Sequence, residues 1–115
     1  MQDELLDKTI RINMLFDFYQ ALLTDKQQTF LRCYYHDNFS LGEIATEFEI
    51  SRQAVFEHIK RAEHMLEEYE QKLGLLIRHT QHSELMDRLR SEIDQVPESY
   101  RNNLTEIVDQ LNRWE

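Results

Sequence analysis

The segment ISRQAVFEHIKRA (residues 50–62) carries side chains that suit contact with the edges of DNA bases. Arginine can pair with guanine, glutamine can pair with adenine, and a phenylalanine ring can touch the methyl group of thymine. A serine at the start of a helix, with the free N–H groups there, can bind a phosphate. If the segment is a helix, its outward side chains form a candidate DNA-binding surface of Ser51, Arg52, Gln53, Phe56, Lys60 and Arg61.

Two helices of unequal length must position this surface. The sequence SLGE (residues 40–43) is a capping box, so we expect a short helix over residues 41–48. Ser51 caps a second, longer helix that runs to residue 73, where Gly74 can end it in the left-handed conformation. Small and apolar side chains allow the two helices to cross closely, which predicts a helix-turn-helix. The residues expected between them are Ile44, Ala45, Ile50, Val55 and Ile59.

The rest of the chain also predicts helices. Apolar residues recur at helical spacing over residues 4–23, and TDKQ (residues 24–27) is a second capping box that begins a helix reaching about residue 35. Residues 75–82 are expected to form a connection that follows the long helix. Residues 83–96 are expected to form another helix, which Pro97 separates from a last helix. The chain has only 2 glycines and 1 proline. We therefore predict an all-α protein with a helix-turn-helix domain over residues 1–74 and a helical extension over residues 75–115.

The extension carries more apolar residues than two free helices need. The stripe consists of Leu85, Leu89, Ile93, Leu104, Ile107, Leu111 and Trp114. It either folds back on the N-terminal helix and completes the core of a monomer, or it forms a dimer or partner surface. We favour a homodimer, because a dimer would also offer two reading helices to two DNA half-sites.

Charge opposes the nucleic-acid interpretation. The formal net charge is −9, and residues 24–66 hold five Lys or Arg against seven Asp or Glu. Phosphate neutralisation supplies most of the affinity of DNA-binding proteins, so this chain starts at a disadvantage. Glu49 also occupies a turn position where glycine is common, and a left-handed Glu would cost on the order of 1 kcal/mol. The distribution of charge decides between partners: one basic strip would favour a nucleic acid, and a strip interrupted by carboxylates would favour a protein. The residues of that test are Lys26, Arg32, Arg52, Lys60 and Arg61.

Other functions find little support in the sequence. There is no apolar run long enough to span a membrane, and the acidic N-terminus lacks the basic start of a signal peptide, so we expect a cytoplasmic protein. The lone Cys33 is expected to be a small buried hydrophobe. His79, His82 and Glu84 are too few for a metal site, and no glycine-rich phosphate loop occurs. We expect neither a cofactor nor a metal nor an enzymatic activity.

The segment LTDKQQTFLRCYYHDNFSLGEIATEFEISRQAVFEHIKRAEHML (residues 23–66) resembles region 4 of bacterial sigma factors. The matching features are the TxxQ start, the LRxYY helix, the SLxEIA helix and the ISRQAV recognition helix. Extended in both directions, over roughly residues 10–110, the chain is similar to the small YlxM family, which is encoded beside the signal recognition particle GTPase genes in Gram-positive bacteria. The sigma regions directed at core polymerase are absent, so the chain is no complete sigma factor.

The resemblance implies a DNA-binding regulatory protein that acts in the signal recognition particle pathway. The positions that match the reading surface of the motif are again Ser51, Arg52, Gln53, Phe56, Lys60 and Arg61. The alternative is an interaction protein whose helix-turn-helix binds a protein or RNA component of that pathway instead of DNA.

Overall fold

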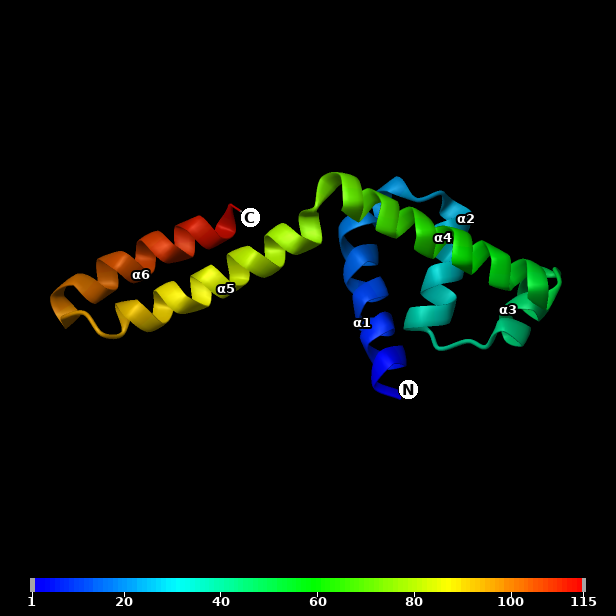
Figure 1. Ribbon diagram of the computed structural model, residues 1–115, viewed down its shortest axis with the longest axis horizontal. Helices are drawn as coiled ribbons and strands as arrows, with labels where there is room; N and C mark the ends of the chain where they lie inside the picture. The colour runs from blue at the N-terminus through cyan, green and yellow to red at the C-terminus, as the bar shows by residue number, and fades with distance from the viewer. Residues whose placement is uncertain (1, 115) are drawn as a thin grey trace. The chain divides into compact units, whose positions relative to one another are not determined.

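The computed structural model describes residues 2–114, and every regular element among them is helical (Figure 1). This confirms the predicted all-α fold. The helices follow the chain as α1 (Gln2–Tyr19), the 3₁₀ turn η1 (Gln20–Leu22), α2 (Asp25–Leu31), the π-helical turn η2 (Arg32–His36), α3 (Leu41–Phe48), α4 (Arg52–Leu73), α5 (Leu75–Ile93) and α6 (Glu98–Arg113). The chain divides into two compact units, Met1–Gly74 and Leu75–Glu115.

The core of the first unit lies where α1, α2 and α3 pack against α4. Its largest fully buried side chains include Leu15, Tyr19, Phe30, Leu31, Ile44, Val55 and Leu66. Phe30 of α2 lies with its ring centroid 5.0 Å from Phe48 and 5.0 Å from the imidazole of His58. Phe48 is nevertheless 39% exposed, and Leu73 is 46% exposed. Both lie in the last turn of a helix, where one side of the side chain stays open to solvent.

Local signals fix the ends of these helices. In α2, the Thr24 hydroxyl accepts from the Gln27 N–H at 3.1 Å, while the Thr24 N–H donates to Gln27 Oε1 at 3.0 Å. This is the predicted capping box. At the other end of the unit Gly74 has φ 64° and ψ 30°, and its N–H donates to the Glu70 carbonyl, so α4 ends in the left-handed conformation as the sequence predicts.

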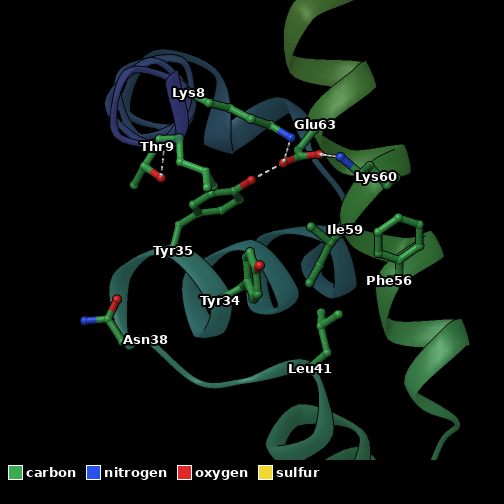
Figure 2. A pocket seen from close by; sticks show the side chains of 11 residues that line it. Lys8, Thr9, Tyr34, Tyr35, Asn38, Leu41, Phe56, Ile59, Lys60 and Glu63 are labelled. Carbon is green, nitrogen blue, oxygen red and sulfur yellow. Dashed lines mark hydrogen bonds and ion pairs between the residues drawn. The ribbon is translucent and has the colours of Figure 1, made fainter. Parts of the chain in front are cut away.

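The helix predicted to reach residue 35 changes character after Leu31. Its last turn, η2, widens, and the Asp37 N–H donates to the Arg32 carbonyl five residues earlier at 3.0 Å. The wider turn directs Tyr35 toward α1 and α4 (Figure 2). Cys33 lies in the same turn and is half-buried, less completely than the sequence predicts, and burial raises the pKa of its thiol.

The second unit is a hairpin of α5 and α6, which run antiparallel beside each other (Figure 1). Residues 75–82 belong to α5, so the prediction of a connection there is wrong; the segment contains no helix breaker. Pro97 does separate the two helices, as predicted. The hairpin's own cluster of buried residues is small: Met86, Ile93 and Val108, with Val96 against them. Arg90 also donates to Asp109 Oδ1 at 2.9 Å across the two helices.

Most of the large apolar side chains of this hairpin are exposed. We call Leu85, Leu89, Tyr100, Leu104, Ile107, Leu111 and Trp114 the apolar face; their exposed fractions run from 37% to 87%, with Trp114 at the upper end. Neither helix therefore buries its predicted stripe against the other. Of the stripe positions, only Ile93 belongs to the buried cluster between α5 and α6; its neighbours there are Met86 and Val108.

No helix in the described part of the chain combines the length and the apolar character needed to cross a membrane. Within residues 2–114, His, Cys, Asp and Glu side chains do not gather in threes in a way that could hold a metal ion.

Candidate nucleic-acid interface

Helix α3, a three-residue turn and helix α4 form the helix-turn-helix. The Ser40 N–H donates to Glu43 Oε1 and the Glu43 N–H donates to Ser40 Oγ, both at 3.0 Å, and this capping box begins α3. Glu49 then adopts φ 56° and ψ 42°, the left-handed conformation, and the Ile50 N–H closes the turn on the Ala45 carbonyl at 3.1 Å. The turn is thus built in the usual conformation, although its residue is a glutamate.

Ser51 begins α4 as a cap, because its hydroxyl accepts from the Ala54 N–H at 3.0 Å. The helices meet through buried Ile44 and Ala45 of α3 and buried Val55 and Ile59 of α4. Ile50, between them, is half-buried. The first turns of α4 are thus buried on the side of Val55 and Ile59, and their opposite side faces solvent. That exposed side is the one that the major groove of DNA would contact.

At the start of α4 three candidate residues lie together. Arg52, Gln53 and Phe56 are exposed and, with Leu41 of α3, line an open hollow of about 460 Å³. The Gln53 amide lies 3.5 Å from Glu57 Oε1, a long contact that base edges could replace. Phe56 is 41% exposed, a large fraction for a phenylalanine ring. This end of the helix therefore presents one cation, one amide and one aromatic ring to solvent, with the Lys60 ammonium 5.6 Å from the centre of that ring.

Lys60 differs from these residues, because it contacts a carboxylate of its own helix. Its Nζ lies 3.5 Å from Glu63 Oε2, and Lys8 Nζ of α1 lies 3.5 Å from the other oxygen, Oε1 (Figure 2). The Tyr35 hydroxyl donates to Glu63 Oε1 as well. Only 9% of the Glu63 side chain is exposed, against 48% for Lys60. We call Lys8, Tyr35, Lys60 and Glu63 the Glu63 cluster.

The Glu63 cluster joins three elements of the unit at one buried charge. It borders a cavity of about 300 Å³ between α1, η2 and α4, whose lining includes Tyr34 and Phe56 (Figure 2). Two ammonium groups share one carboxylate, and the nearness of Lys60, followed by burial, lowers the pKa of Lys8. Burial, followed by the hydrogen bond to Glu63, raises the pKa of Tyr35 far above its usual value, so its hydroxyl remains a donor. Lys60 therefore stabilises the fold and is only partly available to a phosphate.

Arg61 lies on another side of α4. Burial, followed by the positive charges of Lys26 and Arg61, lowers the pKa of His58. Arg32 lies elsewhere, with its guanidinium 5.8 Å from the centre of the Phe16 ring of α1. The five basic residues whose convergence would indicate a nucleic acid are thus divided: Arg52 at the start of α4, Lys60 at Glu63, Lys26 and Arg61 near His58, and Arg32 against α1.

Sequence reasoning missed Glu63 and Lys8. Glu63 follows Ile59 by four residues and precedes Leu66 by three, and both of these are buried. Its spacing therefore places it on the inner side of α4, a signal that could have been read from the sequence. A carboxylate at such a position needs partners, and Lys8 and Tyr35 supply them from distant parts of the chain.

Comparison with known proteins gives a consistent result. A family model described as "Putative helix-turn-helix protein, YlxM / p13 like" matches residues 6–111. The chain is 50% identical over 111 residues to a UPF0122 protein of Halalkalibacterium halodurans, covering 96% of this chain and 100% of that one. It is 53% identical over 89 residues to a UPF0122 protein of Geobacillus kaustophilus (77% and 81% covered) and 59% identical over 85 residues to one of Exiguobacterium sibiricum (74% and 80% covered).

Proposed function

Because the chain belongs to the UPF0122 family of YlxM/p13-like helix-turn-helix proteins, we propose that it is a regulatory DNA-binding protein that docks the start of α4 in a major groove. The observation that carries the proposal is the grouping of Arg52, Gln53 and Phe56, all exposed, at the capped end of a helix supported by α3. Such a role belongs in the cytoplasm and requires no catalysis.

Each candidate residue has a stated role in this complex. Arg52 and Gln53 would contact base edges, and Phe56 would contact a thymine methyl group. Ser51 and the first N–H groups of α4 would approach one phosphate, and Lys60 and Arg61, on two sides of the helix, would approach others. Two copies of the chain would place two α4 helices at two half-sites.

The test is a titration of a fluorescently labelled duplex, first of random sequence and then of sequences selected from a randomised pool, at about 50 and about 200 mM salt. The variant Arg52→Ala/Gln53→Ala should lose both affinity and selectivity. Gln71→Ala/Lys72→Ala is the matched control, because it removes the same two kinds of side chain from exposed positions in the last turns of the same helix. Equal binding by both variants, or no enriched sequence, would contradict the proposal.

A second candidate function is favoured by the charge around α4. Lys60 is paired with Glu63, the basic residues do not form one strip, and Glu47, Glu49 and Glu57 are exposed on the helix-turn-helix. In this proposal the exposed aromatic rings of the same motif bind a protein component of the signal recognition particle pathway, the pathway that the family resemblance implies; binding to its RNA component instead is the other outcome of the test. Titration of the purified components of that particle, separately and assembled, would identify such a partner, and Phe56→Ala should weaken its binding.

A further inference from the structure

The apolar face of the α5–α6 hairpin has the spacing of a helix-packing seam. On α6 the exposed residues are Tyr100, Leu104, Ile107, Leu111 and Trp114, separated alternately by four and three residues. This 3.5-residue repeat is the one that keeps an apolar stripe against another helix over several turns. Val108, the α6 residue that faces α5, belongs to a different side of the helix. The seam is therefore made for a helix other than α5.

The exposed residues of α5 extend the same surface. Successive residues of a helix turn by about 100°, so Leu85 and Leu89 lie about a quarter turn from the side of α5 that carries buried Met86 and Ile93. The α6 seam lies about a quarter turn from Val108 in the same rotational sense. Because α5 and α6 run antiparallel, equal rotation places both stripes on one side of the hairpin. Seven apolar side chains thus form one continuous face.

The hairpin cannot cover this face by itself. It has three buried residues in its own cluster for 41 residues of chain, Leu75–Glu115. Units of about 40 residues usually need disulfides, metals or association to be stable, and within the described chain no metal cluster is found and the single cysteine lies outside this unit. Association is the remaining means of stabilisation.

The charges around the face suit a second copy of the same hairpin. A two-fold symmetric interface brings a surface against itself, so a surface of one charge would repel its copy. The chain as a whole carries −9, yet the α6 seam is bordered by uncharged Asn103 and Gln110. The border of the α5 stripe holds one charge of each sign, Arg88 and Glu92, which can meet their opposites across a two-fold axis.

We infer that the apolar face pairs with the same face of a second chain, so that two α5–α6 hairpins form a four-helix bundle. The interface centres on Leu104, Ile107 and Leu111, with Trp114 covered by the partner chain. Packing of two hairpins through such seams is a common arrangement of helical bundles. The inference stands independently of what α4 binds, because it rests on the second unit alone.

Sedimentation of the full chain over a range from about 1 to 100 µM tests the pairing, a range that brackets micromolar affinity. The expected mass is twice the 14.0 kDa of one chain at the upper concentrations. Leu104→Glu/Leu111→Glu should weaken self-association at least about 100-fold, since it places charges at the centre of the interface. Ser91→Glu/Asn102→Glu adds the same charge at exposed positions of the hairpin outside the face, and should leave the mass doubled.

Trp114, the one tryptophan of the chain, gives a second measurement that needs no variant. It is 87% exposed in a single chain, so its fluorescence should shift to shorter wavelength and resist quenching as the wild-type chain is concentrated. A 14.0 kDa mass at every concentration would overturn the inference. A dimer that survives Leu104→Glu/Leu111→Glu, or that Ser91→Glu/Asn102→Glu also dissociates, would overturn the assignment of the face.

Discussion

Replacing Glu63 by glutamine should weaken the fold and strengthen nucleic-acid binding at the same time. Glutamine keeps the shape and can still accept from the Tyr35 hydroxyl, but it removes the charge that holds Lys8 and Lys60 at 3.5 Å. The hydrogen bond to a charged acceptor becomes a neutral one, a loss on the order of 1 kcal/mol. The two lysines are 46% and 48% exposed, so each ion pair adds only about 0–1 kcal/mol.

The free energy of unfolding should therefore fall by roughly 1–3 kcal/mol, which a shift in the urea midpoint followed by far-UV circular dichroism can measure. Binding should change in the opposite direction, because Lys60 is released beside the reading surface. One additional phosphate contact makes the slope of log K against log salt steeper by about 0.9 and raises affinity about tenfold at ~50 mM salt.

Glu68→Gln is the matched control. It removes the same charge from the same helix, but Glu68 is 43% exposed and its ion-pair partner is His64, at 3.4 Å. Its stability should stay within about 0.5 kcal/mol of wild type, and its salt slope should not change. If Glu63→Gln binds DNA no more tightly than Glu68→Gln, or with an unchanged salt slope, then Glu63 does not hold Lys60 back from phosphate and the reasoning is refuted.

Three further predictions concern stability. Glu49→Gly should stabilise the chain by about 1 kcal/mol, because Glu49 has φ 56°, a conformation that glycine adopts without strain. Glu47→Gly, inside α3, should destabilise the chain by a similar amount. Urea midpoints of the two variants that shift in the same direction would contradict this prediction. Ser40→Ala should cost about 1 kcal/mol through loss of the α3 cap, and Ser91→Ala, exposed within α5, should cost less than about 0.5 kcal/mol in the same assay. Because the pKa of His58 is lowered in the folded chain, the unfolded chain protonates this imidazole at a higher pH than the folded chain does. The free energy of unfolding should therefore be full above about pH 6.5 and decline below it. The urea midpoint of His58→Gln should decline less with falling pH than that of wild type, and an equal decline would exclude His58 as the cause.

Features that depend on a few neighbouring residues could be predicted from the sequence. The capping boxes at Thr24 and Ser40 and the stop at Gly74 are local hydrogen-bond arrangements, and the structure contains all three. The all-α fold follows from helical spacing and the scarcity of glycine and proline. The resemblance to the YlxM family is confirmed by the family model over residues 6–111.

Features that depend on distant residues could not be predicted. The contacts of Lys60 are decided by Glu63. Local spacing places Glu63 on the inner side of α4, but its partners Tyr35 and Lys8 come from 28 and 55 residues away in the chain, and spacing does not predict them. The apolar periodicity of α6 predicts that its stripe residues share one side of the helix. It does not predict that α5 packs against a different side, the one that carries Val108. The candidate surface at Ser51, Arg52, Gln53, Phe56, Lys60 and Arg61 remains a prediction, since contact with a ligand is not encoded in spacing alone.

Cys33 is a natural probe of local opening in the first unit. It is the one cysteine of the chain, it lies half-buried in η2 two residues before Tyr35, and burial raises the pKa of its thiol. A half-buried, protonated thiol reacts more slowly with maleimides or disulfide reagents than an exposed thiolate does, so opening of the turn should speed its modification. A change in the labelling rate then reports a change in the local opening of η2. In the wild-type chain, without any engineered probe, the labelling rate of Cys33 should fall if a bound partner stabilises η2 against α4 and rise if it separates them.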